Sequence, residues 1–205
     1  MDNNKNNTLF ILDWDDTLFP TNWVINNNVK IMLPDSHDHY MVYFQELDRV
    51  LSKFLNKLTS YGRVIIVTNA ALEWVNISSI VLPKTYHLLK KVKIVSARTE
   101  YKKKSSNMMD WKTMAFRDII DNEFKNSSLI NVISIGDAEY EYQALISLNK
   151  THRIKGIKYL KSIRFMRQPT HDILIDQLNT LNDAIPQIWN KTQHLDLKFD
   201  HFSKN

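Results

Sequence analysis

Five short runs of apolar, β-branched residues recur along the chain, and their alternation with helical patterns restricts the fold more than any other feature. The runs are Thr8–Leu12, Arg63–Val67, Val92–Val95, Ile130–Ile135 and Tyr159–Phe165. Most of them are continuously apolar, which is typical of strands buried on both faces of a parallel sheet. Helical periodicity covers Tyr43–Thr59, Ala71–Val81, Lys84–Lys90, Asp110–Phe124, Glu139–Leu148 and His171–Trp189. The sequence therefore predicts an α/β fold with helices on both faces of the sheet.

The chain is expected to form one domain over residues 1–205, because no repeat, linker or shift in composition divides it. The core is expected to span about 8–190, followed by a polar tail, 191–205, in which HLDLKF could add a short edge strand. Residues 20–34, PTNWVINNNVKIMLP, contain two short apolar pieces on either side of Asn26–Asn28. Asparagines favour turns, so we expect a β-hairpin directly after the first strand.

Composition excludes several classes of protein. Cysteine is absent, which excludes disulfides, thiolate metal sites and cysteine nucleophiles. Three glycines are too few for a P-loop or a GxGxxG nucleotide site. The first residues are polar, and no apolar stretch reaches the length of a membrane span, so we expect a soluble, cytoplasmic protein.

The stretch TLFILDWDDTLFP ends its apolar run in three aspartates, Asp13, Asp15 and Asp16. Two such charges 4 Å apart repel each other by roughly 4 kcal/mol at an effective dielectric of about 20. A fold accepts this repulsion where a cation or a reaction uses the charge, or where the side chains point into water. Asp16 has no assigned role, and we expect it at the surface or capping a helix.

Other polar side chains follow the second and fourth predicted strands. Thr68 and Asn69 follow one, and Asp137 follows the other, with Glu141 one helical turn later on the same face. Gly136 stands immediately before Asp137, where a close backbone approach would require glycine. Because ligands of open α/β sheets bind at the carboxyl ends of the strands, we expect these groups to lie close to Asp13 and Asp15.

This set of residues has a chemical logic. Carboxylates gather where they bind a hard cation such as Mg²⁺, which prefers oxygen ligands. With Lys112, the metal would neutralise a phosphoryl group brought close to a carboxylate nucleophile, and Thr68 would hold a phosphoryl oxygen. A second carboxylate acting first as acid and then as base splits hydrolysis into two easier steps.

Four motifs, in order along the chain, resemble those of the haloacid dehalogenase superfamily. ILDWDDTL is similar to its first motif, hhhDxDxT, and VIIVTN is similar to its second, an apolar strand that ends in Thr or Ser. DWKTMAF carries the lysine of the third motif, although Lys102–Lys104 compete for that role. GDAEYE resembles the fourth motif, GDxxxD, with Glu141 in place of the last aspartate.

The resemblance implies roles for these residues. Asp13 is expected to be the nucleophile and a magnesium ligand, and Asp15 the general acid and base, with its backbone carbonyl on the metal. Asp137 is the expected principal ligand of the fourth motif, and Glu141 a more distant one. Glu139 is an alternative to Glu141. Thr17 completes the DxDxT form found in phosphatases of the family.

The family also implies a Rossmann-like sheet with strand order 5-4-1-2-3. Its members carry cap domains after the first or second motif, but here both intervals are nearly filled by the predicted elements. The hairpin would therefore act as a small flap, and no large cap domain is expected. An open site of this kind usually implies a macromolecular substrate in the family, or closure by another subunit.

The middle of the chain is basic. From residue 84 to residue 167 we count 18 Lys and Arg against 8 Asp and Glu. We assign Asn69, Arg98 and Lys102 to substrate binding, and the basic segments Arg98–Lys104 and Lys150–Arg167 to the attraction of a polyanion. Phosphorylated nucleic-acid ends, phosphoproteins and phosphoinositides all qualify as substrates, and a merely solvated basic surface is the alternative.

The resulting hypothesis is a Mg²⁺-dependent phosphomonoester hydrolase that forms an aspartyl-phosphate. A phosphotransferase of the same fold and a catalytically silent phosphate-binding module are the alternatives. Trp14, Trp74 and Trp111 are expected to pack in the core rather than to contact substrate. His37 and His39 suggest a metal site, but a third ligand is missing and a solvated loop is favoured. The oligomeric state is left open.

Overall fold

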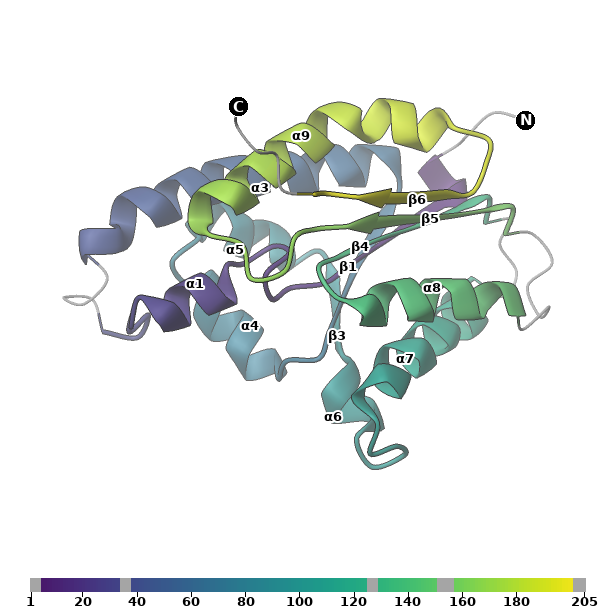
Figure 1. Cartoon of the computed structure of the whole chain (residues 1–205), viewed down its shortest axis with the longest axis horizontal. Coiled ribbons are helices and arrows are strands. Elements are labelled where there is room, and N and C mark those ends of the chain that lie inside the picture. The colour runs from purple at the N-terminus through teal and green to yellow at the C-terminus, as the bar shows by residue number, and fades with distance from the viewer. Residues whose placement is uncertain (1–4, 34–37, 125–128, 151–156, 201–205) are drawn as a thin grey trace.

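A computed structural model describes residues 5–33, 38–124, 129–150 and 157–200, and six strands within these ranges form a single parallel sheet (Figure 1). The order across the sheet is β3-β2-β1-β4-β5-β6. The predicted α/β class is confirmed, and the arrangement is consistent with a Rossmann-like fold. The strands are β1 (Thr8–Leu12), β2 (Arg63–Thr68), β3 (Lys93–Ser96), β4 (Asn131–Gly136), β5 (Tyr159–Arg164) and β6 (Leu195–Lys198).

The prediction of five strands is wrong, because β6 adds a sixth. It forms in the tail, within the HLDLKF stretch where a short edge strand was considered, and pairs in parallel with β5, with Leu195 opposite Lys161. The observed order thus differs from 5-4-1-2-3 by an extra strand at the edge next to β5. Because β6 has only four residues and an edge position, Leu197 remains 39% exposed. Such a strand leaves only a weak apolar signal in the sequence.

The described residues also form eight α-helices and two short 3₁₀ turns. The predicted helices are all present, within a few residues of their expected bounds, and α1 and α6 were not predicted. The helices are α1 (Thr21–Asn26), α3 (Met41–Tyr61), α4 (Leu72–Ser79), α5 (Pro83–Leu89), α6 (Ala97–Tyr101), α7 (Met108–Glu123), α8 (Glu139–Lys150) and α9 (His171–Asn190), and the 3₁₀ turns are η1 (Lys5–Asn7) and η2 (Asp38–Tyr40). None of the described helices is long and apolar enough to cross a bilayer.

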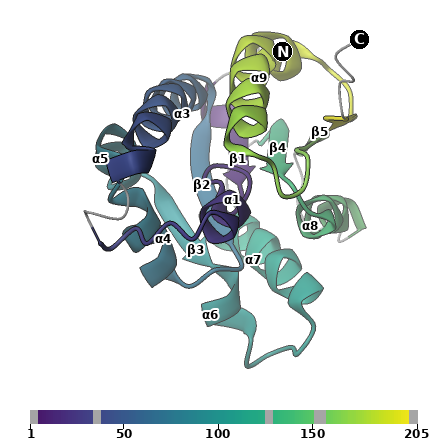
Figure 2. The same ribbon diagram turned by 60° about the vertical axis from the view of Figure 1, so that its left-hand side comes forward.

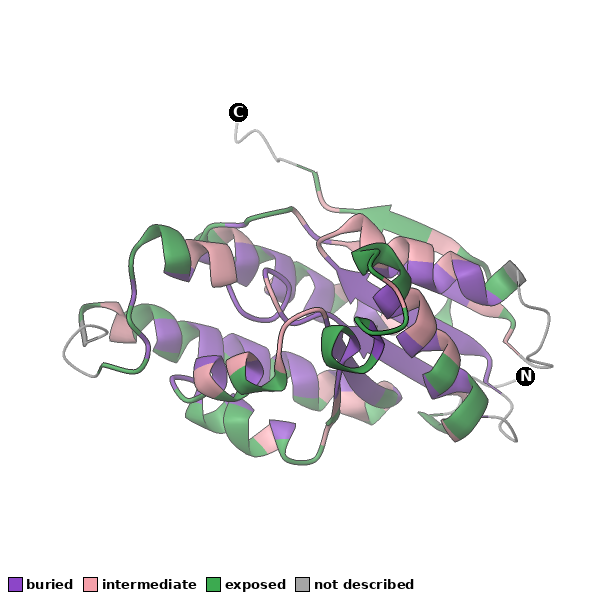
Figure 3. Ribbon diagram, turned by 90° about the horizontal axis from the view of Figure 1, so that it is seen from below, coloured by how far each residue is buried: buried purple, intermediate pink, exposed green. Residues whose placement is uncertain are grey.

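Strand side chains alternate between two apolar cores, one on each face of the sheet. Phe10 and Leu12 of β1 pack in a core that includes residues of α3 and α9, whereas Leu9 and Ile11 pack with α7 and α8. Figure 2, turned from the first view, keeps α3 and α9 on one side of the sheet and α7 and α8 on the other. All five residues of β1 are buried, as the central strands are in Figure 3.

The predicted β-hairpin over residues 20–34 is wrong, because Thr21–Asn26 forms the helix α1. Pro20 occupies the position before the helix, and the backbone N–H of Asn22 in its first turn donates to Oδ1 of Asp16 (2.9 Å). Asn28 has a positive φ of 53°, so the asparagines do form a turn, but the turn follows a helix instead of joining two strands. Val24 is buried on the core side of α1.

The two intervals where a cap domain could be inserted contain elements that pack on the sheet. Between Thr17 and Thr68, the described residues form α1, η2, α3 and β2, and between Asn69 and Lys112 they form α4, α5, β3, α6 and the start of α7. Phe44 of α3 and Val75 of α4 belong to the same buried core as β1. Residues 34–37 of the first interval lie outside the described ranges.

Candidate active site

Asp13 lies directly after β1, at the carboxyl edge of the sheet. Its backbone N–H donates to the carbonyl of Ile135 in the neighbouring strand β4 (2.9 Å), which fixes the direction of the chain as it leaves β1. The Asp13 side chain is buried, and its Oδ1 accepts a 2.6 Å hydrogen bond from Nζ of Lys112 on α7. Lys112 is itself only 1% exposed. A buried ion pair therefore joins the end of β1 to α7.

Lys112 has a second acidic partner, Glu141 of α8, whose Oε1 accepts from the same ammonium group. The other oxygen, Oε2, accepts from the backbone N–H of Ala138 (3.0 Å), so the carboxylate of Glu141 is fixed at both ends. Gly136 makes this position possible, since a Cβ there would lie 2.5 Å from Cδ of Glu141. A glycine is therefore required before Asp137, because the side chain of Glu141 approaches the backbone too closely for any other residue.

Asp15 lies two residues beyond Asp13, and donors from three different elements hold its carboxylate. Oδ1 accepts from Oγ1 of Thr21 on α1 (2.5 Å) and from Nε1 of Trp74 on α4 (2.7 Å). Oδ2 accepts a longer hydrogen bond from Oγ1 of Thr68 at the end of β2 (3.4 Å). These bonds fix the orientation of a half-buried carboxylate beside Asp13, which a positioned acid and base requires.

Two residues that directly follow Asp16 and Thr68 in the sequence have buried polar side-chain atoms without a partner among the described residues. They are Thr17, through Oγ1, and Asn69, through both amide atoms. A buried polar atom left unpaired costs about 1–3 kcal/mol, so a ligand or water that reaches it is stabilised there. Thr68 is different, because its Oγ1 also accepts from the backbone N–H of Ala70 (2.9 Å).

The site holds more negative than positive charge. Burial raises the pKa of Asp13 well above its usual range, opposed by Lys112 and reinforced by Glu141, Asp137 and Asp15. Burial, followed by the charge of Glu141, raises the pKa of Asp137 to about 7. The two carboxylates bonded to Lys112 raise the pKa of that ammonium, although burial opposes them. One buried lysine therefore does not balance the acidic groups around it.

The donor set fits a hard divalent cation in chemistry and charge. All candidate ligands are carboxylate or carbonyl oxygens, which Mg²⁺ prefers, and an added cation would oppose the burial and the repulsion that together raise the pKa values of Asp13 and Asp137. Within the described ranges, however, no three acidic or imidazole side chains are already arranged to hold a metal ion. Glu141, committed to Lys112 and Ala138, is the least available of the proposed ligands.

The basic residues assigned to substrate binding make no contact with the carboxylates around Lys112 among the described residues. Arg98 on α6 and Lys102 just after it are exposed, and no contact joins either side chain to the carboxylates in the part of the chain described. Lys102–Lys104 are all exposed, so Lys112 is the lysine that the fold brings to Asp13. The second basic segment, Lys150–Arg167, includes residues 151–156, which lie outside the described ranges.

Asp16 caps a helix, as expected, but it is 4% exposed and does not lie at the surface. The side chain of Glu139, the alternative to Glu141, bonds Gln143 and Arg164 rather than Lys112. His37 lies outside the described residues, so the pair with His39 has no structural test.

Sequence reasoning missed the two donors to Oδ1 of Asp15. Trp74 was expected only to pack, yet its indole N–H reaches the carboxylate across 59 positions of sequence. Thr21 stands six residues after Asp15, at the start of a helix that was not predicted. The available signal was Pro20 followed by Thr-Asn, because proline is common at the start of a helix.

Fold and site together define an α/β protein with a buried carboxylate–lysine centre at the carboxyl edge of its parallel sheet. Comparisons with protein-family models, with curated proteins and with solved structures found no match. The functional argument therefore rests on the geometry of this centre.

Proposed function

We propose that the chain is a Mg²⁺-dependent phosphomonoester hydrolase of the haloacid dehalogenase type, with Asp13 as its nucleophile. The observation that carries the proposal is the buried centre at the ends of β1 and β4. In it, Lys112 bridges Asp13 and Glu141, while Asp15 is held beside them by three donors. A purely phosphate-binding module needs cationic groups but has no use for an oriented second carboxylate.

In the first step, a carboxylate oxygen of Asp13 attacks phosphorus. The bond between phosphorus and the ester oxygen breaks, and Asp15 donates a proton to the departing alcohol. Because Lys112 donates to Oδ1 of Asp13, we expect Oδ2 to be the oxygen that attacks. The product of this step is an acyl phosphate on Asp13 and a free alcohol.

In the second step, water attacks the phosphorus of the acyl phosphate, and Asp15 accepts the proton from that water. The bond between phosphorus and the Asp13 oxygen breaks, which releases inorganic phosphate and restores both carboxyl groups. The unpartnered amide of Asn69 would bond a phosphoryl oxygen through Nδ2. Thr68, which already bonds Asp15 and Ala70, would mainly position the acid and base.

Asp13, Asp137 and the backbone carbonyl of Asp15 would hold the Mg²⁺. When bound, the ion supplies the positive charge that a dianionic phosphoryl group needs before a carboxylate can approach it. Glu141 would act through Lys112, whose ammonium it fixes against Asp13.

The proposal is tested with an aryl phosphate, with and without Mg²⁺. Asp13→Asn should lower turnover by roughly a thousandfold or more, since a covalent step is lost. Asp16→Asn is the matched control, because it removes a neighbouring charge but keeps an acceptor for the backbone of Asn22. Circular dichroism checks the fold of both variants. Comparable turnover by wild type and Asp13→Asn would overturn the nucleophile assignment.

A further inference from the structure

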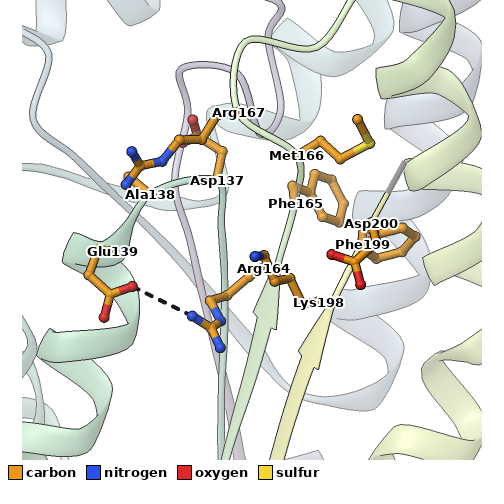
Figure 4. A pocket seen from close by; sticks show the side chains of 10 residues that line it. All are labelled: Asp137, Ala138, Glu139, Arg164, Phe165, Met166, Arg167, Lys198, Phe199 and Asp200. Atoms are coloured by element: carbon orange, nitrogen blue, oxygen red, sulfur yellow. Dashed lines mark ion pairs between the residues drawn. The ribbon is translucent and has the colours of Figure 1, made fainter. Parts of the chain in front are cut away.

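A cavity of about 440 Å³ opens beside the candidate active site (Figure 4). Three segments form it, namely the start of α8, the end of β5 with the loop after it, and the end of β6. Asp137 belongs both to the wall of this cavity and to the charged surroundings of Asp13. Its volume lies in the range of about 300–1,000 Å³ that holds small organic ligands. A group bound there would lie next to the proposed phosphoryl site.

Two of the three basic side chains around the cavity are available to a ligand. Arg164 is already engaged: it bonds both carboxylate oxygens of Asp196 (3.1 and 2.6 Å), pairs with Glu139 (3.5 Å) and lies over the ring of Tyr142. Arg167 and Lys198 are exposed, and no carboxylate among the described residues pairs with either of them. Arg167 and Lys198 both line the cavity (Figure 4), and Lys198 lies opposite Arg164 in the pairing of β5 with β6.

The cavity also has an apolar wall that the fold holds in place. The rings of Phe165 and Phe199 meet edge to face, with centroids 5.2 Å apart. The backbone N–H of Phe199 donates to the carbonyl of Arg164 (2.9 Å), and that of Met166 donates to Oε1 of Gln177 (2.6 Å). Phe165 is buried, whereas Phe199 is only partly buried and lines the cavity. This wall therefore suits a flat ring.

The carboxylate of Asp200 completes the lining, so the cavity is not a simple anion site. A ligand that matches it combines an anionic group for Arg167 and Lys198, a ring for Phe199 and N–H donors for Asp200. Nucleotides have all three features. A phosphorylated inositol ring has the charge but no aromatic face, and a phosphopeptide has no fixed ring beside a second anion.

We propose that this cavity holds the leaving group of the substrate, and that the leaving group is a nucleoside carrying a second phosphate. The proposal rests on the proposed function, since it places the scissile phosphate at Asp13. The second phosphate would bind Arg167 and Lys198, and the base would stack on Phe199. A free nucleoside bisphosphate and a phosphorylated end of a nucleic acid share this chemistry.

Equilibrium binding to the full-length Asp13→Asn chain with Mg²⁺ tests the cavity without turnover. Thymidine 3′,5′-bisphosphate should bind about tenfold or more tightly than thymidine 5′-monophosphate, because a second phosphate gains charge-assisted hydrogen bonds. Adding Lys198→Gln should remove most of that preference, and so should Phe199→Ala. Lys53→Gln is the matched control, because Lys53 is an exposed lysine on α3, away from the cavity.

A 5′-phosphorylated oligothymidylate separates the two sources: binding as tight as that of the bisphosphate assigns the site to nucleic-acid ends, and weaker binding assigns it to free nucleotides. Equal affinity for the mono- and bisphosphate, or an unchanged preference in both cavity variants, would overturn the proposal. Tighter binding of a phosphotyrosine peptide or an inositol phosphate would overturn it as well.

Wild-type turnover of the aryl phosphate is measured in parallel. If that turnover is present but the bisphosphate binds no more tightly than the monophosphate, only the cavity proposal fails. If turnover of every phosphate is absent, the proposed function fails, and with it the leaving-group role of the cavity.

Discussion

Lys161, in the middle of β5, is fully buried and donates through Nζ to the backbone carbonyl of Ile188 in the last turn of α9 (2.7 Å). A second, longer hydrogen bond reaches the carbonyl of Trp189 (3.2 Å). The carbonyl of Ile188 also accepts from the backbone N–H of Lys191 (3.3 Å), so the lysine adds hydrogen bonds to the last turn of a helix, where carbonyls have no partner one turn further on. Lys161 therefore links strand β5 to helix α9, which packs on one face of the sheet.

This arrangement predicts a pH dependence of stability. Burial lowers the pKa of Lys161 to about 8, from 10.5 for an ordinary lysine. Between these two values the unfolded chain binds a proton that the folded chain does not, so the free energy of unfolding should rise with pH across this window. Chemical denaturation at several pH values measures the slope, which Lys161→Met should reduce. An exposed lysine, changed as Lys53→Met, is the control that should keep the wild-type slope, and equal slopes in all three chains would contradict the prediction.

A second prediction concerns Gly136. Gly136→Ala should displace the side chain of Glu141 and so break its bonds to Lys112 and Ala138. We expect a loss of stability of about 1–3 kcal/mol, because the carboxylate of Glu141 loses both donors and the ammonium of Lys112 keeps only Asp13, together with reduced turnover. In a Glu141→Ala background the same glycine change should cost little, because the side chain in its way is gone. A double-mutant cycle by thermal unfolding measures this, and an equal cost in both backgrounds would refute the explanation.

A third prediction separates two tryptophans that each donate one hydrogen bond. Trp74→Phe removes the donor to Asp15 and should lower kcat for an aryl phosphate by about tenfold, the usual effect of losing a hydrogen bond to a charged group. Trp14→Phe removes a hydrogen bond to Ser78 (2.9 Å) but touches no proposed catalytic group through that nitrogen. Its kcat should stay close to the wild-type value. Similar kcat values for the two variants would show that Trp74 has no positioning role.

The proposed metal ligands can be ranked by titration. Asp137→Asn should raise the half-saturating Mg²⁺ concentration by about tenfold, since removing a ligand commonly costs 1–2 kcal/mol or more. Glu141→Gln should raise it less, because the carboxylate of Glu141 is already bonded to Lys112 and Ala138. Activity measured against Mg²⁺ concentration gives both values. A larger shift for Glu141→Gln would reverse the ranking.

The sequence was sufficient for the features that depend on periodicity. β1 was predicted with its observed bounds, because five buried residues in a row leave a clear signal. Lys112 was assigned to the site from the resemblance of DWKTMAF to a family motif, and the structure brings it to Asp13 although 99 positions separate them. Residue type alone could not have chosen it, because Lys102–Lys104 are also lysines in the same region.

Other features depend on tertiary contacts that leave little local signal. The segment after Asp16 reads as two apolar pieces around a turn, but a non-local cap from Asp16 to Asn22 stabilises a helix there. Strand β6 shows only a short alternation of apolar and polar residues, and its backbone hydrogen bonds depend on pairing with β5, which is distant in the sequence. The cavity beside Asp137 could not be read from sequence, because its walls come from three segments that are separate in the sequence, one of them the end of β6.

The central claim is that Asp13 carries the phosphoryl group during turnover. The most direct measurement is to quench the enzyme during turnover of an aryl phosphate with Mg²⁺, reduce it with borohydride and map the modified residue by mass spectrometry. Borohydride converts an aspartyl-phosphate to homoserine, so the account predicts homoserine at position 13 and unchanged aspartate at position 15. Active enzyme with no modification, or with modification only at another residue, would contradict it.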